Sequence, residues 1–148
     1  TYVIDDAELK RVRDSYPNVW PKKVKKPTAV HIGCPHNTYH ELEIWGNAIH
    51  KALKEAGKDK VALQTVMFCS TVVRDHFFME NPELVRDLYA ADVRFSNTCT
   101  VCFAGMKGYT DGNFAVTNSN KTRKYTNSRY IPEMDRMLHI IVTGEMPA

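Results

Sequence analysis

The chain has 148 residues, 43% of them hydrophobic and 25% charged, with a net charge of +3, which predicts a single globular domain with a packed core. The charge excess comes largely from one solvated run of lysines, which consists of Lys22, Lys23, Lys25 and Lys26. We therefore expect no nucleic-acid partner. No apolar window approaches the roughly 18 residues of a membrane helix, and the N-terminus lacks a signal-peptide core, so we expect a cytoplasmic protein without membrane contact.

Residues 1–27 predict a short charged helix followed by a linker. The helix is expected over Asp5–Tyr16, and the Pro- and Lys-rich linker ends at Pro27. We therefore divide the chain into an N-terminal helix and linker, 1–27, and an α/β domain, 28–148.

From residue 28 the chain alternates between strand and helix patterns. Thr38 and Glu41 have the spacing of a capping box at the start of the first long helix. Strands that alternate with helices form a parallel sheet, so we predict a three-layer α/β/α fold with a mostly parallel sheet. The expected elements are a strand over 28–33, a helix over 38–57, a strand over 61–69, a helix capped by Ser70 or Thr71, a helix beginning at Pro82 and a strand over 92–97.

The last third of the chain predicts a loop, a strand and two helices. The loop "TCTVCFAGMKGYTDGN" covers 98–113, and "FAVTN" at 114–118 is a short strand. A polar helix is expected over 119–130 and a final helix over 132–144.

Two cysteines follow strands of the predicted sheet. Ligands gather at the carboxyl ends of the strands in open α/β sheets, and Cys34 and Cys99 both lie there. We expect Cys34 at the mouth of the next helix, where the helix dipole favours a thiolate. Packing and metal ligation are both open for a lone cysteine at such a turn, and the second cysteine favours ligation.

Other thiol chemistries are alternatives at this sheet edge. The His-x-Glu and Pro-Cys-x-x-Cys signature of zinc deaminases is absent, because His40 adjoins Glu41 directly. A thioredoxin-like role for the Cys99-x-x-Cys102 pair is disfavoured, because we expect this motif to run into a loop. A zinc site would use Cys34, His36, Cys99 and Cys102.

The segment "TNSNKTRKY" at 117–125 combines amide and hydroxyl side chains with cations at a helix start. Asn118, Ser119 and Lys121 are candidates for binding a carboxylate or phosphate, although an ordinary helix cap with a solvated basic face is an alternative. His36 is a candidate for proton transfer or for a structural hydrogen bond.

The motifs "IGCPHNT", "NTC", "VTNSNKTRKY" and "VTGEMP", in that order, resemble the C-terminal part of the catalytic subunit of the aconitase X family. The resemblance covers about 28–148 and implies an aconitase-like fold in a fragment of a larger subunit, inactive by itself. It implies a hydro-lyase that dehydrates a small hydroxy acid such as cis-3-hydroxy-L-proline or mevalonate 5-phosphate, with a small swivelling subunit as partner. It further implies an iron–sulfur cluster or mononuclear iron bound by Cys34, Cys99 and a third cysteine outside this chain.

Three positions depart from the family pattern or have no place in it. Asn97 stands where the family usually has Asp, Cys102 is not an expected ligand, and Cys69 is expected to be a packing residue. Two functions outside this family are alternatives: a zinc- or thiol-based binding module without catalysis, and a phosphate-binding module without a metal.

Overall fold

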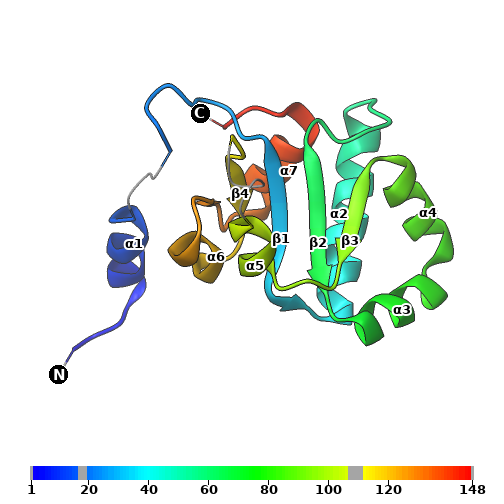
Figure 1. The fold of residues 1–148 in the computed structure, drawn as a ribbon, viewed down its shortest axis with the longest axis horizontal. Coiled ribbons are helices and arrows are strands. Elements are labelled where there is room, and N and C mark those ends of the chain that lie inside the picture. Colours follow the sequence, from blue (N-terminus) through cyan, green and yellow to red (C-terminus); the bar gives the residue numbers. More distant parts are fainter. Residues whose placement is uncertain (1, 17–19, 107–111, 148) are drawn as a thin grey trace.

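Helices and strands alternate along the chain in the computed structural model, which describes residues 2–16, 20–106 and 112–147. The elements are α1 (Asp6–Asp14), β1 (Ala29–Asn37), α2 (Tyr39–Glu55), β2 (Gln64–Cys69), α3 (Thr71–Glu80), α4 (Pro82–Ala90), β3 (Val93–Ser96), α5 (Thr100–Gly105), β4 (Ala115–Thr117), α6 (Asn120–Tyr125), β5 (Arg129–Tyr130) and α7 (Met134–Thr143). Within the described residues the strands form one five-stranded sheet in the order β3-β2-β1-β4-β5, and every neighbouring pair is parallel (Figure 1).

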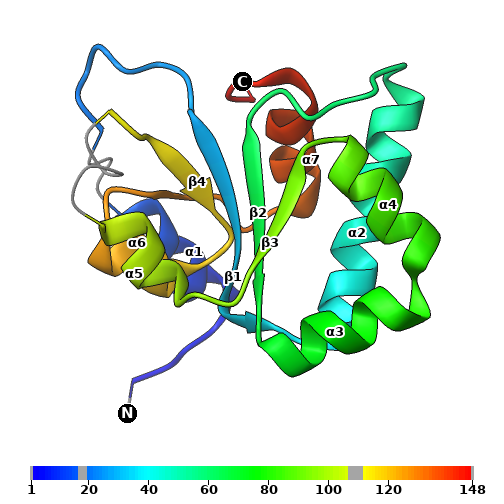
Figure 2. The same ribbon diagram turned by 45° about the vertical axis from the view of Figure 1, so that its right-hand side comes forward.

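The sheet is covered on both faces. Helices α2, α3, α4 and α7 lie on one side, and α5 and α6 lie on the other (Figure 2). The predicted three-layer α/β/α architecture with a parallel sheet is therefore confirmed. Such an arrangement follows from parallel pairing, since each crossover returns the chain over one face of the sheet.

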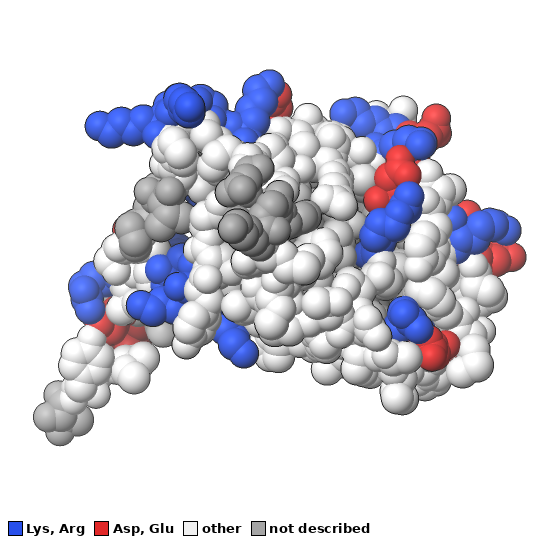
Figure 3. Space-filling view, in the orientation of Figure 1, with Lys and Arg blue, Asp and Glu red and all other residues white. Residues whose placement is uncertain are grey.

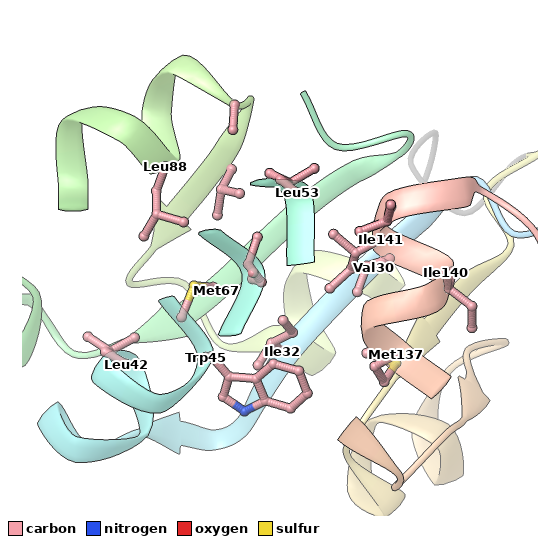
Figure 4. Close-up of a cluster of buried hydrophobic side chains, with 14 of the residues drawn as sticks. Val30, Ile32, Leu42, Trp45, Leu53, Met67, Leu88, Met137, Ile140 and Ile141 are labelled. Atoms are coloured by element: carbon pink, nitrogen blue, oxygen red, sulfur yellow. The ribbon is translucent and has the colours of Figure 1, made fainter. Parts of the chain in front are cut away.

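The larger core lies between the sheet and helices α2 and α7. Val30 and Ile32 alternate with residues of the opposite face along β1, and both are fully buried. They pack with Trp45 of α2 and with Met137 and Ile141 of α7 in one cluster (Figure 4). The apolar periodicity that predicted these helices thus marks the side chains that cover the sheet.

An aromatic cluster fills the opposite face beneath α5. His31 is buried, and its ring lies edge-on to those of Phe68 and Phe103, each with centroids 5.6 Å away. Burial lowers the pKa of His31 from 6.5 to about 4, because the apolar surroundings disfavour the imidazolium.

The predicted helix boundaries follow local capping chemistry. Thr38 and Glu41 form the reciprocal capping box at the start of α2. The hydroxyl of Ser70 accepts a hydrogen bond from the N–H of Val73 at the start of α3. Gly144 ends α7 with a φ of 75°, a left-handed conformation that suits glycine.

The prediction of a loop over 98–113 was wrong for Thr100–Gly105, which form α5, whereas the other described residues of this range are loop. α5 forms there because Ala104 and Thr100 are buried against the rest of the domain and Phe103 joins the aromatic cluster. Residues 107–111 of the predicted loop lie outside the described residues. Tertiary packing stabilises this six-residue helix, which is too short to be stable by itself.

The predicted polar helix over 119–130 is also shorter than expected. α6 ends at Tyr125, and the hydroxyl of Thr126 then donates to Thr122 O and accepts from the N–H of Ser128. These side-chain bonds replace continued helical bonds and direct the chain into β5, a strand that the sequence pattern did not predict.

The N-terminal segment contributes more to the core than a linker would. α1, predicted over Asp5–Tyr16, has no buried residue, and the four lysines of the run are exposed. Trp20 is only 5% exposed, packs edge-on against Phe114 and donates its indole N–H to Asn127 O at 2.8 Å. None of the described helices combines the length and apolarity needed to cross a membrane.

Candidate metal centre

The strand β1 does not end at Gly33, as predicted, but continues through Cys34 to Asn37. The Cys34–Pro35 peptide is cis, and the register with β2 shifts between Ile32 and Asn37. Asn37 bridges this bulge: its buried amide donates to Ile32 O at 3.0 Å and to Phe68 O at 2.9 Å. The cap of α2 is Thr38, so the expectation that Cys34 lies at the mouth of that helix was wrong.

The segment after β4 holds one side of the Gly33–Cys34 turn. The N–H of Gly33 donates to Asn118 Oδ1 at 3.1 Å, and the hydroxyl of Ser119 donates to Cys34 O at 2.6 Å. Ser119 Oγ also accepts from the N–H of Thr122 at 3.1 Å and so caps α6. Two predicted substrate-binding residues therefore contact the turn that carries Cys34.

The segment after β3 holds the other side of the same turn. Although β3 lies two strands from β1, the chain crosses back below the strand ends to reach α5 (Figure 1). The buried hydroxyl of Thr100 donates to Gly33 O at 2.5 Å, and His36 Nε2 lies 3.1 Å from Thr98 O. Because a carbonyl oxygen only accepts, this contact requires the proton on Nε2.

Cys99 is the N-cap residue of α5, so the helix-mouth environment expected for Cys34 belongs to Cys99 instead. The backbone N–H groups of Cys102 and Val101 face its sulfur and lower the pKa of the Cys99 thiol, with a smaller contribution from the charge of Lys121. The contact with Cys99 in turn raises the pKa of Cys102. The reason for disfavouring the Cys99-x-x-Cys102 motif was wrong, since the motif does open a helix.

The predicted site residues differ in exposure. Cys34 is half-buried, Cys99 and Lys121 are exposed, and Ser119 is 4% exposed. Both hydrogen-bonding functions of the Ser119 hydroxyl are used within the chain, whereas the amide nitrogen of Asn118 donates no hydrogen bond to a described residue. Lys121 and Asn118 thus remain accessible to a ligand.

Cys69 and Asn97 have structural environments. Cys69 belongs to the main core, and burial raises the pKa of its thiol to about 11. Asn97 donates from Nδ2 to the hydroxyl of Thr71 at 2.9 Å, which joins the end of β3 to the start of α3.

The donor set fits partial ligation of a thiophilic metal ion. One thiol, Cys34, directly follows Gly33 in this turn, and the other, Cys99, precedes Thr100, which donates to Gly33 O. The lowered pKa of the Cys99 thiol favours the thiolate that metals bind. Among the described residues no group of three or more His, Cys, Asp or Glu side chains could hold a metal ion. The described residues therefore do not form the zinc site of Cys34, His36, Cys99 and Cys102, and complete ligation would need a donor from outside them.

Two residues that position the site were not identified from the sequence. Asn37 and Thr100 contact only main-chain carbonyls at the Gly33 turn, and both are buried. Their position directly after the "GCPH" and "TC" motifs was a signal, since a polar residue beside such a turn often bonds the local backbone.

Comparisons with known proteins give a fold relationship. No family model and no curated protein matches the chain. Among solved structures, the chain is similar to the crystal structure of Thermococcus kodakaraensis aconitase X in its holo-form, with a TM-score of 0.64 and 18% sequence identity. The match covers 97% of this chain and 34% of that chain, so this chain spans about a third of the length of the Thermococcus kodakaraensis protein. The fold is therefore that of part of aconitase X.

Proposed function

We propose that this chain is the C-terminal domain of the catalytic subunit of an aconitase X type hydro-lyase, with 28–148 as the α/β domain and 1–27 as its N-terminal helix and linker. The observation that carries the proposal is the hydrogen-bonded turn at Gly33–Cys34. The segment that carries Cys99 bonds to one side of this turn, and the Asn118–Ser119 segment bonds to the other. It occurs in a domain whose fold matches part of aconitase X.

Cys34 and Cys99 would each supply one thiolate to an iron–sulfur cluster or a mononuclear iron, with a third cysteine outside this chain. Iron with one open position supplies a Lewis acid for the hydroxyl that leaves the substrate. The thiolate of Cys99 is favoured before any metal binds, because N–H groups and Lys121 face it. Thr100 and Ser119 hold the two cysteine segments in place through the carbonyls of Gly33 and Cys34.

The substrate is a small hydroxy acid, such as cis-3-hydroxy-L-proline or mevalonate 5-phosphate. Lys121 would bind its anionic end, and the amide of Asn118 would donate a hydrogen bond to it. Ser119 would act by positioning, because its hydroxyl is engaged by Cys34 O and the N–H of Thr122. His36 is the candidate for proton transfer in this chain, and Nδ1 is the atom left to accept a proton once Nε2–H bonds Thr98 O.

The test is to express the complete catalytic subunit anaerobically with the small swivelling subunit and to measure iron content and both dehydrations. Cys34→Ser and Cys99→Ser are expected to lose iron and activity together. Cys102→Ser is the matched control: it lies one helical turn from Cys99 and is also exposed, and it should retain iron. Equal iron content in all three variants would refute the proposed ligation, and retained iron without either dehydration would refute the proposed substrates.

A further inference from the structure

A pocket of about 220 Å³ lies between the end of α1, helix α6 and the chain from β5 into α7. We call it the arginine pocket after Arg13, Arg123, Arg129 and Arg136, which line it together with two tyrosines and two acids, among others. Basic side chains gather where α1 meets the body of the molecule, at the left of Figure 3. None of Cys34, Cys99, Asn118, Ser119 and Lys121 lines the pocket.

Each of the two acidic side chains of the arginine pocket is paired with at least one cation. Asp14 pairs with Lys10 and lies 3.6 Å from Arg13. Glu133 accepts from Arg13 at 3.0 Å, and its other oxygen lies 3.9 Å from Arg136, beyond hydrogen-bonding distance. The acids therefore neutralise Arg13 and only partly neutralise Arg136.

The remaining two arginines have neutral partners. Arg123 donates from Nε and Nη2 to Asn120 Oδ1, at 3.1 and 2.9 Å, and its guanidinium lies 3.7 Å from the centre of the Tyr16 ring. Arg129 lies over the ring of Trp20 at 5.8 Å. Within residues 2–16, 20–106 and 112–147 neither guanidinium has a carboxylate at ion-pair distance. Asn120 and Tyr16 fix the orientation of Arg123, and its Nη1 donates no hydrogen bond to a described residue.

Four arginines against two acids give the pocket an excess of two positive charges. The guanidinium group of arginine can donate two parallel hydrogen bonds to the oxygens of a phosphate group. A phosphomonoester carries a charge of about −1.5 to −2 at neutral pH. The volume is below the roughly 300–1,000 Å³ of pockets for drug-sized ligands, which favours a compact anion. Tyr130 adds a hydroxyl donor, and burial raises its pKa, which keeps that donor protonated.

We propose that the arginine pocket binds the phosphate group of a small phosphomonoester. Arg123 and Arg129 supply the uncompensated charge, and Arg136 can turn from Glu133 toward the ligand. Arg13 of α1 and Tyr16, which follows that helix, complete the lining. The proposal does not depend on the metal centre.

The test is calorimetric titration of the metal-free chain with inorganic phosphate at low, constant ionic strength and pH 7.5. Saturable binding with one phosphate per chain is expected, and Arg123→Gln and Arg129→Gln should each weaken it about 10-fold or more, because each removes a charge-assisted hydrogen bond. Arg129→Lys should restore part of the affinity. The matched control is Arg86→Gln, an exposed arginine of α4 paired with Asp87, which should leave the affinity unchanged.

A second control distinguishes this pocket from the anion site proposed beside the metal centre. Lys121→Gln removes the cation of that anion site, and the phosphate binding that Arg123→Gln and Arg129→Gln weaken should persist in it. Thermal unfolding without phosphate shows whether each variant is folded. Loss of binding in Lys121→Gln, with wild-type affinity in folded Arg123→Gln and Arg129→Gln, would overturn the proposal. Absence of saturable binding to the wild-type chain would overturn it as well.

Discussion

Gly33→Ala should destabilise the chain more than an alanine substitution at a glycine whose added Cβ would meet no neighbouring atom. Gly33 has a φ of 105°, a conformation that costs other residues about 1–2 kcal/mol. An added Cβ would lie 2.7 Å from Phe68 O and 2.8 Å from Cγ of Asn37, so the Asn37 amide must move. That displacement breaks its bonds to Ile32 O and Phe68 O in a buried site, at about 1–3 kcal/mol. The expected total is about 2–5 kcal/mol.

Urea unfolding at 25 °C, followed by tryptophan fluorescence, measures this loss in the free energy of unfolding. Gly57→Ala is the matched control: Gly57 also has a positive φ, 62°, but an added Cβ there meets nothing within 4 Å, so only the backbone term of about 1–2 kcal/mol remains. In an Asn37→Ala background Gly33→Ala should cost less than in wild type, because the two positions are coupled. Equal losses for Gly33→Ala and Gly57→Ala would refute the steric reasoning.

Three further predictions concern the same domain. Thr100→Val should lower the free energy of unfolding by about 1–3 kcal/mol in urea, because it leaves the buried oxygen of Gly33 without its donor. Ser119→Ala should cost about 1–2 kcal/mol in the same measurement, because the hydroxyl both caps α6 and donates to Cys34 O. The pKa of His31 is lowered from 6.5 to about 4, so below pH 6.5 the unfolded chain binds a proton that the folded chain does not. The free energy of unfolding should therefore be at its full value above pH 6.5 and fall by about 3 kcal/mol as the pH drops from 6.5 to below 4.

Each of these predictions has a control. Thr143→Val removes an exposed hydroxyl bond to His139 O, and a loss as large as that of Thr100→Val would contradict the role of burial. Ser70→Ala removes a helix cap that makes one bond, so it should cost less than Ser119→Ala. His31→Leu should show a smaller decline in stability between pH 7.5 and pH 4, and an unchanged decline would exclude His31 as its source.

Sequence pattern predicted most of the parallel α/β fold because its signals are local. Apolar spacing marked the buried faces of α2 and α7, and side-chain caps such as Thr38 and Ser70 marked where helices begin. The same local reasoning failed for α5, whose stability depends on the distant rings of His31 and Phe68. It failed equally for β5, which forms only because β4 offers it an edge.

The sequence by itself determined which residues near the carboxyl ends of the strands carry groups that could bind a metal or an anion: Cys34, Cys99, Asn118 and Lys121. Only the tertiary structure decided how they are related, because Cys99 follows a strand that is not a neighbour of β1. The chain returns to β1 through the bonds of Thr100 to Gly33 O and of His36 to Thr98 O, across separations of more than sixty residues. Such contacts depend on the packing of the whole sheet, so no local pattern could show that the helix-mouth thiol would be Cys99 rather than Cys34.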